Sequence, residues 1–163
     1  MRKRLAMTMG LISLLMGCDP QKISELEEGV ATEAAVRARF GEPAAVYAEA
    51  GGGQTFEYPR QPEGQRNYMI TIGTDGRMSA LRQVLAPAVF ARVTPGLDKA
   101  QVRRLLGRPA KTQVYSMKQE EAWDWRYLDG AQSKQFSVTF DLQGRVLNAA
   151  STDDPRDVRG GGG

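Results

Sequence analysis

The sequence predicts an α+β fold with two tandem ααβββ modules, each with two short helices packed on one face of an antiparallel sheet. Three features of the 163-residue chain lead to this prediction: a motif that occurs twice, a change from helical to alternating periodicity within each copy, and a glycine turn near the end of each copy. We place the modules at residues 23–85 and 86–150, with their boundary at Ala86-Pro87.

The repeated motif extends from a helix cap to a proline. Thr32-x-x-x-Val36-x-x-x-Phe40-Gly41-x-Pro43 recurs 66 residues later as Asp98-x-x-x-Val102-x-x-x-Leu106-Gly107-x-Pro109. Further correspondences follow in the same order: Phe56-x-Tyr58 with Trp125-x-Tyr127, Ile70-x-Ile72 with Val138-x-Phe140, and Asp75-Gly76-Arg77-Met78 with Gln143-Gly144-Arg145-Val146. The shared order indicates a true internal repeat.

The first part of each motif predicts a short, cleanly ended helix. Thr32 and Asp98 are good N-cap residues, because their side-chain oxygens accept hydrogen bonds from free backbone N–H groups. Gly41 and Gly107 stand where a helix C-terminus requires a positive φ, and a proline follows two residues later. A shorter helical turn is expected before each helix, near residues 23–28 and 88–93.

The second part of each motif predicts three antiparallel strands. Apolar and polar residues alternate there, as they do in half-buried strands, and the glycine turns connect the last two strands of each copy. Because the boundary between the copies is too short to be a flexible linker, we expect the modules to pack together or share a sheet. Residues 151–163 lack apolar periodicity and are expected to be a disordered tail.

The N-terminus predicts export and a lipid anchor. Residues 1–17 have a positive start and an apolar run too short to span a membrane, which is typical of a signal peptide. Leu15-Met16-Gly17-Cys18 resembles the lipobox of bacterial lipoproteins, so Cys18 is the expected lipidation site, carrying fatty acyl chains such as palmitate, and residues 18–22 are the tether. The alternative is an ordinary signal peptide with an incidental thiol.

The composition argues against several function classes. Arg2, Lys3 and Arg4 lie in the leader; without them 19 basic residues remain, equal to the 19 acidic ones, so no nucleic-acid partner is expected. The chain has no histidine and a single cysteine, which excludes imidazole-based catalytic triads, Cys/His metal clusters and intramolecular disulfides. We expect no enzyme activity, no cofactor, no metal and no small-molecule substrate.

The order of the motifs is similar to the small outer-membrane lipoprotein family typified by BamE (SmpA/OmlA) of the β-barrel assembly machine. The resemblance covers nearly all of residues 23–150, once per copy, and implies a periplasmic, non-catalytic, protein-binding role, with that machinery as a candidate partner. The tandem arrangement also resembles the β-lactamase inhibitor proteins, which implies the alternative of an inhibitor that grips an enzyme through one concave sheet. The BamE-like resemblance favours the outer membrane, whereas Asp19 after the cysteine resembles an inner-membrane retention signal.

Two further groups are candidates for contacts outside the chain. Trp123 has no aromatic counterpart in the first copy, where Gln54 stands, so we predict that it lies at the rim of the core and binds a partner. A set of arginines near the capped helices could contact lipid headgroups or simply be solvated, namely Arg37, Arg39, Arg103, Arg104 and Arg108. The adjacent acid pairs at 27–28, 120–121 and 153–154 are expected to be surface charges.

Overall fold

A computed structural model describes residue 23 and residues 25–158. The predicted leader, Cys18 and its tether therefore lie outside the described residues. The first module contains helix α2 (Glu33–Phe40) and strands β1 (Ala45–Ala48), β2 (Gln54–Pro59), β3 (Asn67–Ile72) and β4 (Met78–Gln83). The second contains helices α3 (Pro87–Phe90) and α4 (Lys99–Leu106), strands β5 (Lys111–Tyr115), β6 (Glu120–Asp129), β7 (Gln132–Phe140) and β8 (Val146–Asp153), and helix α5 (Pro155–Val158).

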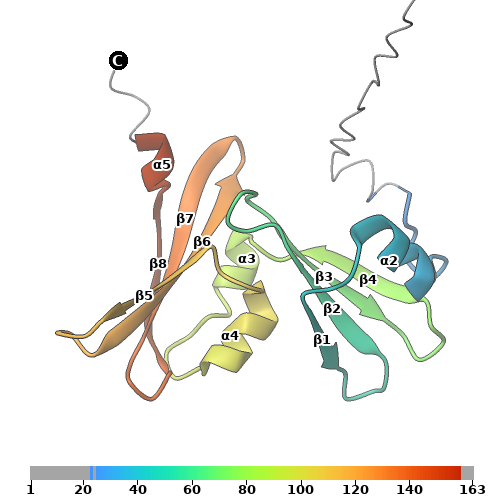
Figure 1. Cartoon of the computed structure of the whole chain (residues 1–163), viewed down its shortest axis with the longest axis horizontal. Coiled ribbons are helices and arrows are strands. Elements are labelled where there is room, and N and C mark those ends of the chain that lie inside the picture. The colour runs from blue at the N-terminus through green and yellow to red at the C-terminus, as the bar shows by residue number, and fades with distance from the viewer. Residues whose placement is uncertain (1–22, 24, 159–163) are drawn as a thin grey trace, which may run out of the picture.

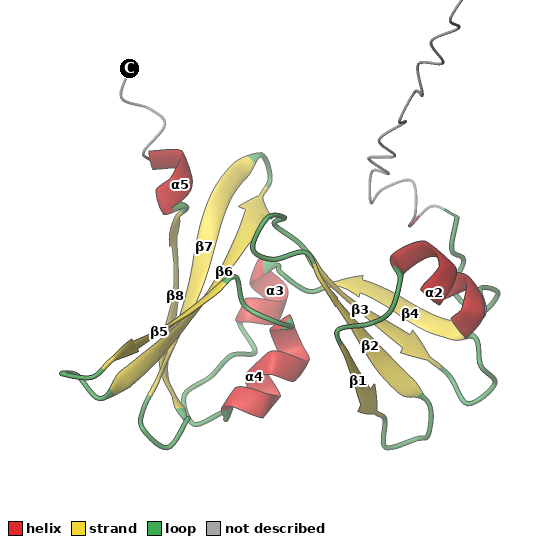
Figure 2. Cartoon of the chain, viewed as in Figure 1, coloured by secondary structure: helices red, strands yellow, loops and turns green. Residues whose placement is uncertain are grey.

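The α+β class and the two tandem modules are confirmed. Each module forms its own four-stranded antiparallel sheet, with the strands in sequence order (Figures 1 and 2). Each sheet thus has one strand more than predicted, because β1 and β5 are short edge strands with little alternation in their sequences. Since the sheets share no strand, the single concave sheet of the inhibitor alternative is not formed.

The predicted helix boundaries are confirmed in both copies. The Thr32 hydroxyl accepts from the N–H of Ala35, and Asp98 forms a complete capping box with Gln101. Gly41 and Gly107 end their helices with φ of 82° and 74°. Before α2, Ile23 is helical, as expected near residues 23–28, and hydrogen-bonded turns follow it, as in the bond from the N–H of Leu26 to the carbonyl oxygen of Ile23.

Helix α4 lies between the two sheets, whereas α2 covers the far face of the first sheet (Figure 1). Val36 and Phe40 of α2 pack on one face of the first sheet, against residues such as Phe56. The opposite face of that sheet receives α4, which also packs against the second sheet through Val102 and Leu106. The first sheet is therefore covered on both faces.

Each module has its own apolar core, and the repeated aromatic residues form it. Phe56 and Tyr58 are buried in the first core, and Trp125 and Tyr127 in the second. In the second core, Phe90 of α3 stacks on Phe136 with ring centroids 4.0 Å apart. The predicted core role of Trp125 and Tyr127 is confirmed.

The expected disordered tail is wrong for residues 151–158. Strand β8 continues to Asp153, and α5 follows it directly. Asp154 is buried, and its carboxylate accepts a 2.6 Å hydrogen bond from Nε of Arg126. The polar sequence of this segment hid its structure because a buried ion pair, rather than apolar residues, fixes it. Residues 159–163 lie outside the described part.

Candidate interaction surfaces

The contact between the modules is built on buried polar side chains, beginning with Glu57 of β2. Its carboxylate is fully buried and accepts hydrogen bonds from both Nε and Nη2 of Arg103, at 3.0 and 2.9 Å. It also accepts from the N–H of Arg108 and from the hydroxyl of Tyr47 at 2.6 Å. Burial, together with the bond to Glu57, raises the pKa of Tyr47 to about 12. Because Arg103 and Arg108 belong to the second module, Glu57 joins the two.

Asn67 of β3 makes a second connection between the modules. Its Nδ2 donates to the carbonyl oxygens of Leu106 and Arg108, at 2.7 and 3.0 Å, while its Oδ1 accepts from the N–H of Arg60. A side chain of the first module thus satisfies carbonyl groups at the C-terminus of α4, which a helix leaves without partners. A Cβ on Gly107 would lie 3.0 Å from Nδ2 of Asn67, so any larger residue there would press on Asn67.

The third connection involves Gln61 and Arg126. The side chain of Gln61 donates to the carbonyl oxygen of Arg126 at 2.7 Å and accepts from its N–H at 3.2 Å. Arg126 also pairs with Asp154. Burial by itself would raise the pKa of Asp154, but the N–H of Arg156 and the guanidinium of Arg126 hold it below its usual value. The expectation that Asp154 is a surface charge is therefore wrong.

Arginines near the capped helices mostly pair with carboxylates. Arg37 pairs with Glu33 and Glu42, and Arg39 with Glu25. Arg103 pairs with Glu57, and Arg104 with Glu49. These contacts account for four of the five arginines that we considered for lipid headgroups, and they favour the intramolecular interpretation.

Trp123 lies at the rim of the second core, on the same face of β6 as Trp125. It is partly buried, and its ring packs against Phe140 with centroids 5.0 Å apart. Its indole N–H donates to Glu121, which in turn pairs with Lys99 of α4 at 2.6 Å. The hydrogen bond from Lys99 lowers the pKa of Glu121. The binding role of Trp123 stays a prediction.

Exposed apolar side chains occur on both edge strands and in both turns at the end of the second sheet where Trp123 lies. The register places Val114, Glu121, Phe140 and Val146 in one row across the four strands. Large exposed hydrophobic residues lie in or next to this row: Val114 and Tyr115 of β5, Met117 in the β5–β6 turn, Leu142 in the β7–β8 turn, and Leu147 of β8. We call these five residues the hairpin end.

Within residue 23 and residues 25–158, no group of three His, Cys, Asp or Glu residues could hold a metal ion. Within the same residues, no helix is long and apolar enough to cross a membrane.

No family model and no curated protein matches the chain. Among solved structures, the osmotically inducible lipoprotein OsmE is similar with 25% identity and a TM-score of 0.37, over 46% of this chain and 85% of that one. The DUF4309 family protein YjgB from Bacillus subtilis has 17% identity and a TM-score of 0.34, over 83% of this chain and 86% of that one. A protein described as a β-lactamase inhibitor protein from Streptococcus mutans has 11% identity and a TM-score of 0.33, over 82% and 94%.

These structural neighbours thus include a lipoprotein and an inhibitor-type protein.

Proposed function

We propose that the protein is a lipid-anchored protein of the bacterial cell envelope that binds a protein partner, without catalysis, through the hairpin end and Trp123. The supporting observation is that most of the large exposed apolar side chains lie at one end of the second sheet. Five of the seven large hydrophobic residues exposed in the described part of the chain belong to the hairpin end. Exposed apolar residues concentrated in one region are typical of protein-binding surfaces, and a partly buried tryptophan beside them is a suitable anchor.

The anchor is proposed on Cys18, from the lipobox-like sequence before it. Stable anchoring requires more than one acyl chain, as a bacterial lipoprotein N-terminus provides. Cys18→Ser should therefore yield an uncleaved or soluble species in place of a membrane-bound one. The test is detergent phase partitioning, and unchanged partitioning of this variant would exclude the lipoprotein assignment.

The partner is proposed to be an envelope protein, with the β-barrel assembly machinery as the first candidate, from the resemblance of the repeat to the BamE-like family. The alternative is an enzyme that this protein inhibits. Two assays distinguish these partners. An inhibited enzyme loses activity when the purified protein is added, whereas the assembly machinery retains the protein in a stable complex.

The binding surface is tested by capturing partners from detergent-solubilised membranes with lipidated protein. Val114→Glu combined with Met117→Glu places charge on the hairpin end, and Trp123→Ala removes the proposed anchor. We expect both variants to lose a partner that wild-type protein captures. Val46→Glu is the matched control, because Val46 is also an exposed valine on an edge strand, but in the first module.

Thermal denaturation separates lost binding from lost folding. Trp123→Ala should lower the melting temperature by less than Trp125→Ala, since Trp125 is fully buried and donates to the carbonyl oxygen of Gly107. Capture that is equal for wild type and the hairpin-end variant, or lost equally with Val46→Glu, would exclude this surface.

A further inference from the structure

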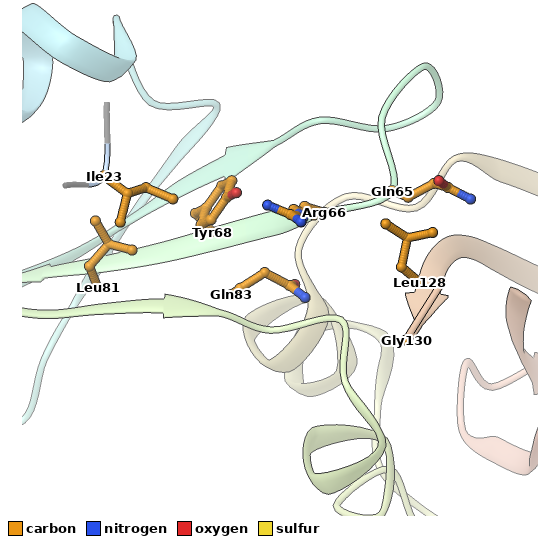
Figure 3. A pocket seen from close by; sticks show the side chains of 8 residues that line it. All are labelled: Ile23, Gln65, Arg66, Tyr68, Leu81, Gln83, Leu128 and Gly130. Carbon is orange, nitrogen blue, oxygen red and sulfur yellow. The ribbon is translucent and has the colours of Figure 1, made fainter. Parts of the chain in front are cut away.

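A pocket of about 450 Å³ lies beside the first module, where the β6–β7 hairpin approaches strands β3 and β4. Figure 3 shows Tyr68 and Arg66 next to each other in this pocket, with Ile23 and Leu81 on one side and Leu128 on the other. Its volume is within the range of small-molecule sites. None of the contacts described above uses it.

Two buried polar atoms at this pocket lack a hydrogen-bond partner among the described residues. They are the hydroxyl oxygen of Tyr68 and Nε2 of Gln65, and no other buried side-chain nitrogen or oxygen in this part of the chain is in that state. Tyr68 is only 1% exposed. A buried polar group without a partner costs about 1–3 kcal/mol, so its presence calls for an explanation.

The internal repeat shows that the core does not require this hydroxyl. Tyr68 precedes Ile70 by two residues, and the corresponding residue of the second copy is Phe136, which precedes Val138. Directly across the strand pair, Tyr58 donates its hydroxyl to the carbonyl oxygen of Gly41 at 3.0 Å. Two neighbouring tyrosines thus differ, because one hydroxyl is satisfied within the protein and the other borders the pocket.

The charge and the walls of the pocket indicate the chemistry of a ligand. Among the described residues that line it, Arg66 is the only charged one, and it forms no ion pair with any other described residue. Ile23, Leu81 and Leu128 provide apolar walls. A cation and a hydroxyl donor beside apolar walls suit an acceptor group that carries negative charge on an apolar body.

We propose that this pocket binds an anionic amphiphile, with its carboxylate or phosphate head on Tyr68 and Arg66 and its apolar chain against Ile23, Leu81 and Leu128. Membrane phospholipids and free fatty acids share this chemistry. The site is separate from the hairpin end, so the proposal does not depend on the proposed function.

Calorimetric titration tests the proposal on residues 18–163 with Cys18→Ser, which contain every described residue and need no detergent. The probes are decyl phosphate and decanoate below their micelle concentrations, with neutral decyl maltoside and inorganic phosphate as references. We expect the two anionic amphiphiles to bind at least tenfold more tightly than either reference. Tyr68→Phe and Arg66→Gln should each weaken that binding at least fivefold.

Two control variants make the result specific. Tyr58→Phe should lower the melting temperature yet bind normally, whereas Tyr68→Phe should bind poorly at an unchanged or higher melting temperature. Arg92→Gln removes an exposed arginine outside the pocket and should bind like wild type.

Vesicles containing phosphatidylglycerol identify the source of the ligand. Sedimentation with vesicles that depends on Tyr68 and Arg66 would indicate a membrane lipid, and binding of decanoate alone would indicate a free fatty acid; either supports the site. Equal affinity for decyl maltoside, an unchanged affinity in Tyr68→Phe, or no binding of any anionic probe would overturn the proposal.

Discussion

At the residue scale, the buried carboxylate of Glu57 meets donors from both modules. Glu57→Ala would leave Arg103 partly buried without its counter-charge, so we expect it to lower the free energy of unfolding by about 3 kcal/mol. Arg103 keeps some access to water, which is why this value is at the low end for a broken buried pair.

Urea denaturation measures this effect, and Glu49→Ala is its control. Glu49 pairs with Arg104 across the same module contact, but both side chains are more exposed. Exposed pairs contribute about 1 kcal/mol or less. Equal losses in the two variants would mean that Glu57 has no special role.

Gly107 and Gly41 allow backbone strain and crowding to be separated. Both have a positive φ with ψ near 180°, a region essentially restricted to glycine, where any other residue is strained by about 1–3 kcal/mol. A Cβ at Gly41 would have no neighbour within 4 Å, whereas at Gly107 it would press on Asn67. Gly107→Val should therefore lower the melting temperature further than Gly41→Val. Equal shifts would contradict the proposed contact between Asn67 and the end of α4.

Local chemistry made some residues predictable from the sequence and left others hidden. Caps and terminal glycines act through their nearest neighbours, so Asp98 and Gly107 could be assigned in advance. Glu57 and Arg126 occupy equivalent positions between two aromatic residues in their strands. A charged residue at this position in both copies indicated that each side chain forms a buried ion pair. Its partners, however, come from distant segments, and no local pattern identifies them.

At the element scale, the last strand and α5 are held by Asp154. Because the pKa of Asp154 is lowered in the folded state, its charged form stabilises the fold above about pH 4, and this contribution is lost as the pH falls through the lowered value. Asp154→Asn should cost stability at pH 7, and its difference from wild type should shrink below about pH 4.

Urea titrations at several pH values measure this difference. Asp153→Asn is the matched control, because Asp153 pairs with Lys134 but is largely exposed. A constant difference between wild type and Asp154→Asn from pH 7 to pH 3 would contradict the role of the Asp154 charge.

The elements that the sequence did not predict are those with little apolar periodicity. β1 and β5 are edge strands with mostly exposed or half-buried side chains, so the alternation that marked the central strands is weak in them. The end of β8 and α5 depend on backbone pairing with β7 and on the Arg126 pair. The central strands and capped helices, whose apolar faces build the cores, were predicted.

At the scale of the whole molecule, the repeat predicted two similar modules but not how they pack. The second module packs α4 against the first sheet, while no helix equivalent to α4 packs on the corresponding face of the second sheet among the described residues (Figure 1). Arg126 stands there in place of Glu57 and pairs with Asp154. Arg37 of α2 corresponds to Arg103 of α4. If α2 packed on a second sheet as α4 packs on the first, Arg37 would face Arg126 and two positive charges would meet.

The central claim is that buried polar contacts make the two modules one cooperative unit. Both tryptophans of the chain, Trp123 and Trp125, lie in the second module, so their fluorescence reports on that module alone. Hydrogen exchange of backbone amides in β2 and β3 reports on the first. Urea unfolding of the full chain should give one midpoint by both probes, and Glu57→Ala should shift both together. Two separate midpoints in wild-type protein, or a shift confined to one module, would contradict the claim.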